Sequence, residues 1–490
     1  MKTKLIALSI LVVVIFLPGA NFAQAQLSDA EIIALAQKLF LPADQERQSL
    51  TAEQTTTAKR CGTPELLKME KALRSPFVAE STRETVAQIK ALSKPPFTRH
   101  YNTTHFAFSY TTPDISPTHG VLPTTVKSLS NALESLFTKY NTNFGGIDTP
   151  NGTRTNVEIY NLGTSWGMAF PYEYTIALAP AALKVICDLR TTAAHELFHR
   201  VEFAAGWPTN IAETSYNFWI EGLATWAQHF AYPTNYDYIA WISAQGGYLD
   251  APDKHFNVSR SYNAVTFWQF LSERYTKLTG RSPAVLIRSI FKTYKDQGPS
   301  AIMYEILKSK INALWGKYYV GKPYTAFEGM MQRLYLTNYL KDEPGVTGYT
   351  YTDAHNTNLT CGNLWKMIPV HVNSAYNLTP SAPNKSISNQ TVKRGGSDYL
   401  TFYPSTGART LSFRVTNNGV LVSVLRFKGS NLISITTKKS TSAGFQFDNS
   451  GDIADRILVV IGGLKSQYAH YSLSAAAGFW VLASARPLAV

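Results

Sequence analysis

The sequence predicts an α+β protein in which a mixed domain is followed by a C-terminal all-β sandwich domain. Residues 97–343 contain both strand and helix patterns, with strands concentrated in the first half and helices in the second. Short segments of alternating apolar residues then recur beyond residue 383. Asn418 and Gly419, which stand between two of them, form a dipeptide typical of a tight β-hairpin turn.

Length and composition are those of a globular protein with more than one domain. The chain has 490 residues, of which 45% are hydrophobic and 16% are charged. This balance excludes a disordered or low-complexity chain. Because a chain of this length rarely forms a single core, we expect two or three domains.

The first 25 residues have the pattern of a signal peptide. Lys2 and Lys4 precede an apolar run over residues 5–17, and Ala23 and Ala25 form the small-residue pattern of a cleavage site. The apolar run is short for a membrane-spanning helix. We therefore expect a secreted or extracytoplasmic protein whose mature chain begins near residue 26.

The net charge of +13 comes from 46 basic and 33 acidic residues. Residues 381–490 contain twelve Lys or Arg against four Asp, so +8 of the excess lies in the last quarter of the chain. An exported protein rarely meets nucleic acid, and we expect no nucleic-acid partner. The basic surface could contact an anionic cell surface or a glycan, or it could serve solubility alone.

The chain is expected to divide into five parts. They are the signal peptide 1–25, a helical N-terminal segment 26–96 that could be a propeptide, the mixed domain 97–343, a linker 344–383, and the sandwich 384–490. Within the mixed domain, hydrophobic periodicity predicts strands at 105–110, 155–160 and 174–187, helices at 124–140, 192–205 and 216–230, and further helices over 262–340.

The strongest chemical signal is the run from His195 to His199, with Glu196 between the two histidines. On a helix, residues four apart project from one face, so the two imidazoles can share one metal ion. Glu196 is then offset toward the open coordination side. Incidental histidines on a structural helix are the alternative interpretation.

A catalytic zinc ion needs a third protein ligand and one position for water. Glu221 lies on an otherwise apolar helix, where an unpaired carboxylate is costly to bury, and a metal would remove this cost. Glu213 is the rival candidate, although it can equally be a solvated or capping acid. Glu202 and Ala205 replace the Gly and His that a metzincin would need.

At these residues the sequence resembles the gluzincin metallopeptidases of the MA clan over roughly residues 97–340. Their H-E-x-x-H helix is followed by a helix often written W-x-x-E-G-x-A, and Trp219, Glu221, Gly222 and Ala224 are similar to it with the tryptophan one position closer. The resemblance implies a gluzincin-like zinc metallopeptidase domain with His195, His199 and Glu221 as zinc ligands and Glu196 as the general base.

The resemblance also implies a group that stabilises the oxyanion. Tyr262 is similar in position to the tyrosine that related aminopeptidases use, while Tyr248 and His255 are weaker candidates and packing is the alternative role for Tyr262. The Gly-x-Met-Glu-Asn signature of those aminopeptidases does not continue after Gly167 and Met168. This departure puts recognition of a free amino terminus in doubt, and the sequence does not decide between an endopeptidase and an exopeptidase.

The sequence thus predicts a secreted zinc peptidase that hydrolyses peptide bonds by a zinc-bound water. We expect Zn²⁺ as the cofactor, a protein or peptide as the substrate, and a monomer. The alternative from another class is a non-catalytic secreted surface or adhesion protein that retains the metallopeptidase-like scaffold. The intact Glu196 argues against that alternative, since a purely structural metal site needs no base.

Three cysteines, Cys61, Cys187 and Cys361, are too few for a disulfide scaffold. We expect a disulfide from Cys61 to Cys361 or Cys187, with Cys361 favoured if Cys187 is a buried free thiol. The alternative comes from residues 60–65, which resemble the cysteine-switch segment of matrix metalloproteinase propeptides, where a thiolate binds the catalytic zinc. Lys59 departs from that segment, which has a proline there.

Overall fold

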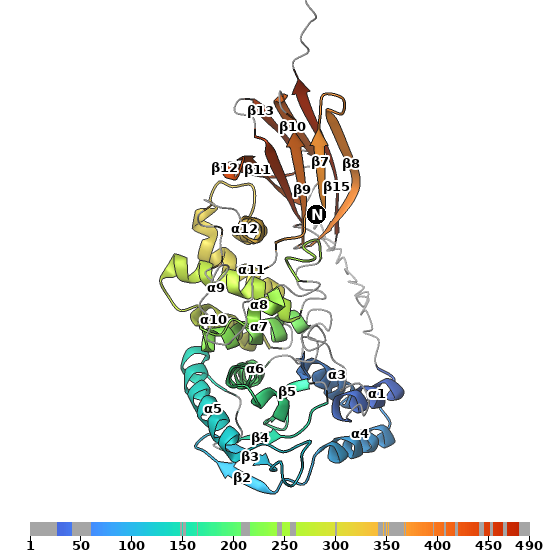
Figure 1. Ribbon diagram of the computed structural model, residues 1–490, viewed down its shortest axis with the longest axis vertical. Helices are drawn as coiled ribbons and strands as arrows, with labels where there is room; N and C mark the ends of the chain where they lie inside the picture. The colour runs from blue at the N-terminus through green and yellow to red at the C-terminus, as the bar shows by residue number, and fades with distance from the viewer. Residues whose placement is uncertain are drawn as a thin grey trace, which may run out of the picture.

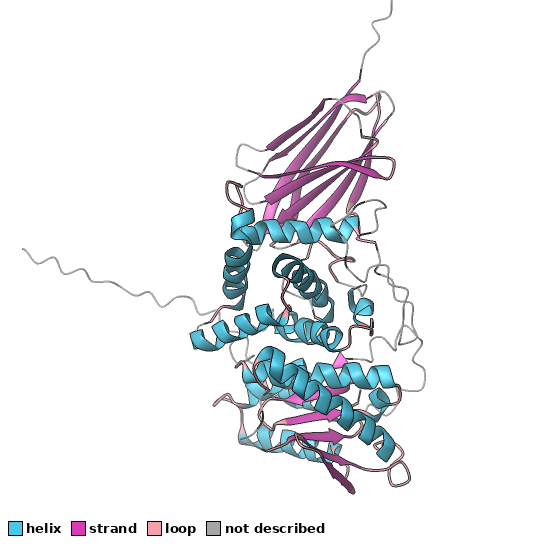
Figure 2. Ribbon diagram, turned by 90° about the vertical axis from the view of Figure 1, so that its left-hand side faces the viewer, coloured by secondary structure: helices cyan, strands magenta, loops and turns pink. Residues whose placement is uncertain are grey.

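The computed structural model shows an elongated molecule with β-sheets toward both ends and helices between them (Figures 1 and 2). It describes residues 27–41, 60–147, 149, 153–163, 165–206, 216–242, 247–254, 261–298, 301–341, 346, 349, 351, 367, 369–394, 396–405, 408–416, 420–440, 445–450, 454–463 and 468–479. The predicted signal peptide lies outside these residues. No helix in the described ranges is both long and apolar enough to cross a lipid bilayer.

A six-stranded sheet lies beside the helices that carry the predicted site. Its strands in spatial order are β1 Arg60–Cys61, β5 Ser165–Phe170, β6 Thr175–Leu178, β4 Thr155–Ile159, β3 Phe106–Tyr110 and β2 Arg99–Asn102. β3, β4 and β6 run parallel to one another, β5 is antiparallel to β6, and β1 pairs with β5 in parallel. Every second side chain of β3 is buried, because one face of the sheet covers the core.

Eight α-helices follow β3 in the described part of the chain. They are α5 Pro123–Phe144, α6 Ile186–Ala204, α7 Tyr216–Ala231, α8 Tyr238–Ile242, α9 Val265–Thr279, α10 Ala284–Gln297, α11 Met303–Trp315 and α12 Ala326–Leu340, with the 3₁₀ helices η2 Pro180–Leu183, η4 Tyr262–Ala264 and η6 Gly316–Tyr318 between them.

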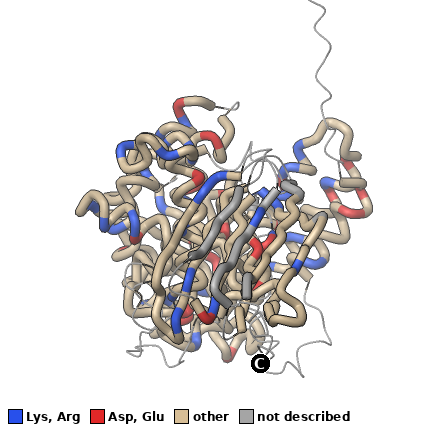
Figure 3. Tube along the Cα trace, turned by 90° about the horizontal axis from the view of Figure 1, so that it is seen from above, with Lys and Arg blue, Asp and Glu red and all other residues tan. Residues whose placement is uncertain are grey.

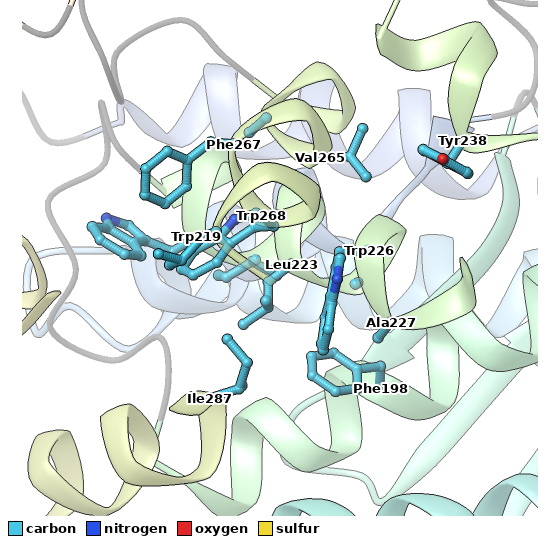
Figure 4. Close-up of a cluster of buried hydrophobic side chains, with 14 of the residues drawn as sticks. Phe198, Trp219, Leu223, Trp226, Ala227, Tyr238, Val265, Phe267, Trp268 and Ile287 are labelled. Atoms are coloured by element: carbon cyan, nitrogen blue, oxygen red, sulfur yellow. The ribbon is translucent and has the colours of Figure 1, made fainter. Parts of the chain in front are cut away.

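The large apolar core joins these helices to one face of the sheet. Aromatic side chains form its centre: the ring centres of Trp219 and Trp268 lie 5.7 Å apart, and Figure 4 shows them in one buried cluster with Trp226 and Phe198. The hydroxyl of Tyr140 on α5 donates to the carbonyl oxygens of Ala194 on α6 and Ala227 on α7, each at 3.1 Å. These contacts fix α6 and α7 beside each other, which matters because both carry predicted site residues.

Three N-terminal helices cover the other side of the sheet near β5 and β6. They are α1 Asp29–Phe40, α3 Thr63–Leu73 and α4 Glu80–Ser93. Their buried side chains, among them Ile32, Leu66 and Val86, share one apolar cluster with Met168 and Phe170 of β5. The helical N-terminal segment is therefore packed onto the sheet, and the role of a propeptide remains a prediction.

Two further sheets form the C-terminal part of the molecule. Their strands are β7 Ser374–Leu378, β8 Asn384–Lys393, β9 Ser397–Pro404, β10 Ala408–Thr416, β11 Val420–Lys428, β12 Asn431–Lys439, β13 Phe445–Ser450, β14 Arg456–Gly463 and β15 Tyr468–Phe479. The orders are β13-β10-β15-β8 and β12-β11-β14-β9-β7. A second apolar core, with Val392, Phe402, Val422 and Leu473 from both sheets, lies between them.

The three central strands of the five-stranded sheet, β11, β14 and β9, are buried on both faces, since the second face packs against α12. Gln332 of α12 donates its Nε2 hydrogens to Ser423 Oγ at 2.9 Å and to the Val460 carbonyl at 3.2 Å. Tyr399 Oη donates to the Tyr335 carbonyl at 2.7 Å. Burial on two faces explains why β11 and β14 have nearly continuous apolar sequences instead of alternating ones.

Lys and Arg positions lie along the strands of this C-terminal part when it is viewed from its end (Figure 3). Several of them are bound to the helical part. Lys439 pairs with Glu328 of α12 at 2.9 Å, Arg456 donates to Tyr339 Oη at 3.1 Å, and Arg394 lies 4.6 Å from the ring centre of Tyr304. Part of the predicted basic surface therefore contacts the protein itself.

The predicted elements agree with the structure in many places and differ in several, and strands β2 and β5 were not predicted. Residues 174–187 were expected to be strands, but only β6 is a strand there, since Pro180 opens a 3₁₀ helix and α6 begins at Ile186. The range 344–383, predicted as a linker, includes β7. β7 pairs with β9 in parallel, so the sandwich is not wholly antiparallel.

Candidate metal centre

Two histidines project from one face of α6 into the buried interior. His195 and His199 are 5% and 0% exposed, and their ring centres lie 4.8 Å apart. This is the arrangement expected for residues four apart on a helix. Burial lowers the pKa of His199 well below its usual value, and the nearby His195 adds to this shift. This shift favours the neutral imidazole, the form that binds a metal.

Glu221 on α7 faces both histidines. Its Oε2 lies 3.2 Å from His195 Nε2, and its Oε1 lies 3.5 Å from His199 Nε2. Glu221 is fully buried, and its Oε1 has no hydrogen-bond partner among the described residues. The rival ligand Glu213 lies outside the described residues.

Cys61 joins these three residues from the N-terminal segment. One donor atom from each of Cys61, His195, His199 and Glu221 lies within 4.8 Å of the other three. Cys61 Sγ is 3.4 Å from His199 Nε2 and 3.4 Å from Glu196 Oε2. The N-terminal segment and the H-E-x-x-H helix thus meet at one point.

The expectation that Cys61 forms a disulfide is wrong. Cys61 is a free, buried cysteine, whereas Cys187 is disulfide-bonded and lies in the first turn of α6. Cys361 lies outside the described residues. Pairing could not be read from the sequence, because three cysteines allow three different single bridges and only the fold brings sulfur atoms within bonding distance.

Glu196 points to the same place as the metal-ligand candidates. Its Oε2 lies 3.3 Å from Thr63 Oγ1, and Thr63 in turn accepts a hydrogen bond from the Ala169 amide at 2.9 Å. Burial raises the pKa of Glu196 to about 7, with His195 opposing this shift and the Glu221 carboxylate adding to it. A Cβ atom at Gly167 would lie 2.5 Å from Glu196, so β5 can approach this carboxylate only with glycine there.

Two residues that the sequence analysis did not identify hold the histidine rings. Glu202 Oε2 lies 2.7 Å from His199 Nδ1, and Gln228 Oε1 lies 3.2 Å from His195 Nδ1. Gln228 is oriented by its Nε2 donating to Asp237 Oδ2 at 2.9 Å. Helical spacing could have suggested Glu202, which follows His199 by three residues on the same helix.

Tyr262 reaches the cluster from η4. Its hydroxyl accepts a hydrogen bond from the Cys61 amide at 2.5 Å and lies 3.5 Å from the Cys61 carbonyl oxygen. Its ring stacks on Trp241 with centres 4.4 Å apart. A Cβ atom at Gly222 would lie 2.5 Å from Ala264 Cβ, so glycine next to Glu221 lets η4 approach α7. Of the weaker candidates, Tyr248 belongs to the apolar core and His255 lies outside the described residues.

The donor set fits a zinc ion. Two imidazoles, a carboxylate and a thiol are ligands that zinc accepts, and a cation would satisfy the unpartnered Glu221 Oε1. Burial, with the carboxylates of Glu196 and Glu221, raises the pKa of the Cys61 thiol well above its usual range. A bound cation reverses this tendency, because it stabilises a thiolate.

Comparisons with known proteins give only weak similarities. No protein-family model and no curated protein matches this chain. Among solved structures, the M60 catalytic domain with two CBM51 domains of Clostridium perfringens ZmpB covers 82% of this chain, at 10% identity and a TM-score of 0.27, and this chain covers 62% of it. The pre-peptidase C-terminal domain of a Bacillus anthracis collagenase covers 21% of this chain and is itself covered to 93%, at 15% identity and a TM-score of 0.15.

A third similar structure is the periplasmic lysozyme inhibitor PliG of Aeromonas hydrophila. It covers 21% of this chain and is covered to 98%, at 9% identity and a TM-score of 0.17. At these TM-scores the similarities support no argument about the function of this chain. The functional argument therefore rests on the geometry of the cluster.

Proposed function

We propose that this chain is a secreted zinc-dependent peptidase with His195, His199 and Glu221 as the metal ligands. The observation that carries the proposal is the meeting of these three donors, from two helices, beside the carboxylate of Glu196. A metal accounts for the burial of two acids and two histidines at one point, which would otherwise be costly.

Bound zinc would supply Lewis acidity, by polarising a peptide carbonyl and lowering the pKa of a water molecule to about 7. Glu196 would accept a proton from the attacking water and pass it to the leaving amine, since its carboxylate faces the same point as the ligands.

Tyr262 would donate its hydroxyl hydrogen to the developing oxyanion. Its stacking on Trp241 and the close approach of η4 to α7 hold this hydroxyl beside the cluster. Glu202 and Gln228 would orient the two imidazoles, as carboxylate and amide groups do for metal-bound histidines.

The domain assignment and the partners are part of the same proposal. Residues 97–343 would form the peptidase domain, and the sandwich would form a second domain. This second domain would begin near residue 374 instead of residue 384, because it includes β7. A glycan or an anionic surface could be contacted by those basic residues of the sandwich that do not face α11 and α12. The substrate would be a protein or peptide, and the active form a monomer.

A non-catalytic protein with a structural metal site is the second candidate. Cys61 favours it, because four protein donors form a closed site of the structural type. The buried Glu196 opposes it, since a structural site has no use for a fifth ionisable group whose burial is unfavourable.

The experiment that tests the proposal combines metal analysis with cleavage of casein and of a fluorogenic peptide mixture. We expect about one zinc per chain and cleavage that a chelator abolishes and added zinc restores. Both the full-length protein and the Cys61→Ser variant are assayed. Absence of chelator-sensitive cleavage in both would contradict the proposed function.

A further inference from the structure

The cysteine in the metal cluster comes from outside the proposed peptidase domain. Cys61 ends β1, which adds a short strand to the free edge of β5, and the Gly62 amide donates to the Gly167 carbonyl at 2.9 Å. A Cβ atom at Gly62 would lie 2.6 Å from the Met168 side chain. Glycine therefore allows this segment to come close enough to the sheet for its neighbour Cys61 to reach the metal ligands.

Cys61 contacts each part of the machinery that the proposed reaction needs. Its sulfur is 3.4 Å from the Nε2 atom of His199 and 3.4 Å from the carboxylate of Glu196, so it lies between a metal ligand and the base. Its backbone amide and carbonyl oxygen engage the hydroxyl of Tyr262. A substrate carbonyl and an attacking water would need these same positions.

The surrounding site is closed in this arrangement. His195, Glu196, His199 and Glu221 are each at most 5% exposed, and Cys61 is 6% exposed. β1 also covers the edge of β5 beside Glu196, where an extended peptide could otherwise add as a strand. Glu196 is therefore shielded from solvent, and residues 60–62 lie on the strand edge beside it.

Contacts away from the cluster hold the segment on the sheet. The first of these contacts is the apolar cluster that α1, α3 and α4 share with β5 and β6. The others are ion pairs. Lys94 of the segment lies 2.8 Å from Glu158 of β4, and Lys90 lies 3.4 Å from Glu173. Thr63, at the start of α3, contacts both the sulfur of Cys61, at 3.0 Å, and Glu196.

We propose that Cys61 is the inhibitory fourth ligand of the zinc site, and that residues 60–62 keep the peptidase latent until the N-terminal segment is displaced. This inference rests on the proposed function. As sulfur binds the metal, the thiol proton leaves to solvent and the position that water needs is filled. Displacement of the segment removes the sulfur, frees Tyr262 and opens the edge of β5 together.

Cobalt substitution tests the ligand without relying on activity. A thiolate bound to Co²⁺ gives an intense near-ultraviolet charge-transfer absorption, which imidazole and carboxylate ligands do not give. We expect this absorption in the cobalt-loaded full-length protein and its loss in Cys61→Ser. The control is Ser93→Ala, which removes a buried hydroxyl from α4 of the same segment, and it should keep the absorption.

Cleavage of a peptide by the zinc-loaded proteins tests the latency. If fewer than about a tenth of the parent molecules have an open site, opening all of them raises the rate at least about tenfold. Cys61→Ser should therefore cleave the peptide at least about tenfold faster than the parent. Gly62→Val keeps the cysteine but pushes the segment from Met168, so it should both weaken the cobalt absorption and raise cleavage. If circular dichroism shows that Cys61→Ser is unfolded, Gly62→Val alone tests whether the segment inhibits cleavage.

Two outcomes would overturn the latency. One is a cobalt-loaded parent without thiolate absorption, and the other is a folded Cys61→Ser or Gly62→Val protein that has lost the absorption but cleaves no faster. The proposed function is judged separately, by whether Glu196→Gln abolishes the cleavage seen in any of these proteins. A parent that is fully active and sensitive to Glu196→Gln would refute latency alone.

Discussion

Oε2 of Glu202 lies 2.7 Å from Nδ1 of His199, one helical turn earlier on α6. Both side chains are fully buried, so this contact fixes which nitrogen of His199 faces Glu221 and Cys61. The ring can then offer Nε2 to a metal ion while Nδ1–H donates to the carboxylate.

The first prediction concerns this contact. Glu202→Ala should weaken zinc affinity by about 10–100-fold, because the imidazole loses the group that orients it. Competition with a chromophoric chelator measures the affinity. Glu202→Gln keeps an acceptor oxygen, so its zinc affinity should fall less than that of Glu202→Ala. Equal affinity of Glu202→Ala and the parent would show that the contact does not support the metal.

The second prediction separates the base from the ligands. Glu196→Gln in the Cys61→Ser background should keep its zinc and lose about 10²–10⁴-fold in kcat, since only proton transfer is removed. Zinc content and peptide cleavage are measured on the same sample. The control is Glu134→Gln on α5, a half-buried acid paired with His105, which should change neither quantity. Undiminished cleavage by Glu196→Gln would refute the mechanism.

The third prediction identifies the third ligand. Glu221→Ala should lower zinc occupancy sharply, because it removes a buried carboxylate that faces both histidines. Glu213→Ala should keep the zinc content of the parent. The reverse pattern would transfer the role of ligand to Glu213, and full retention in both variants would point to another residue.

The fourth prediction concerns the contact between α12 and the five-stranded sheet. A Cβ atom at Gly462 would lie 2.6 Å from Gln332 Oε1 and 2.7 Å from Tyr335 Cε2. Gly462→Ala should therefore lower the free energy of unfolding by about 1–3 kcal/mol. Thermal melting measures this, with Gly316→Ala as the control, since a Cβ atom at Gly316 meets no atom within 4 Å. Equal melting of both variants would contradict the prediction.

The fifth prediction is a pH dependence of stability in the sandwich. Burial raises the pKa of Asp398 from 3.8 to about 7, with the Tyr471 hydroxyl, 2.8 Å away, opposing this shift. Between these pH values the folded protein keeps a proton that the unfolded chain has lost, so the stabilising contribution present below pH 3.8 disappears as pH rises to about 7.

Asp398→Asn removes this titration. The stability of the variant relative to the parent should rise between pH 4 and pH 8 by up to about 4 kcal/mol. Melting temperatures of both proteins across this range measure the effect. A difference between variant and parent that does not change with pH would contradict the shifted pKa of Asp398.

The sequence alone pointed to the candidate ligands His195 and His199 and the candidate base Glu196, because helical spacing is a local property. Residues four apart share a helix face whatever the rest of the chain does, so His195 and His199 could be assigned to one site from their positions. Strands such as β3, β11 and β14 could be predicted for the same reason, since their apolar patterns reflect local geometry.

Other features depend on which distant segments meet, and periodicity carries no information about that. Cys61 and Tyr262 are 201 residues apart in the chain, and only packing brings them into contact. Packing also decides that Cys61 is free and that β11 and β14 are buried against α12. β5 escaped prediction because its small residues, such as Gly167, are required by the approach of Glu196 and weaken the strand pattern. The sequence thus placed the candidate ligands and base on one helix, because their spacing is local, and the tertiary structure decided that Cys61 of the N-terminal segment lies among them.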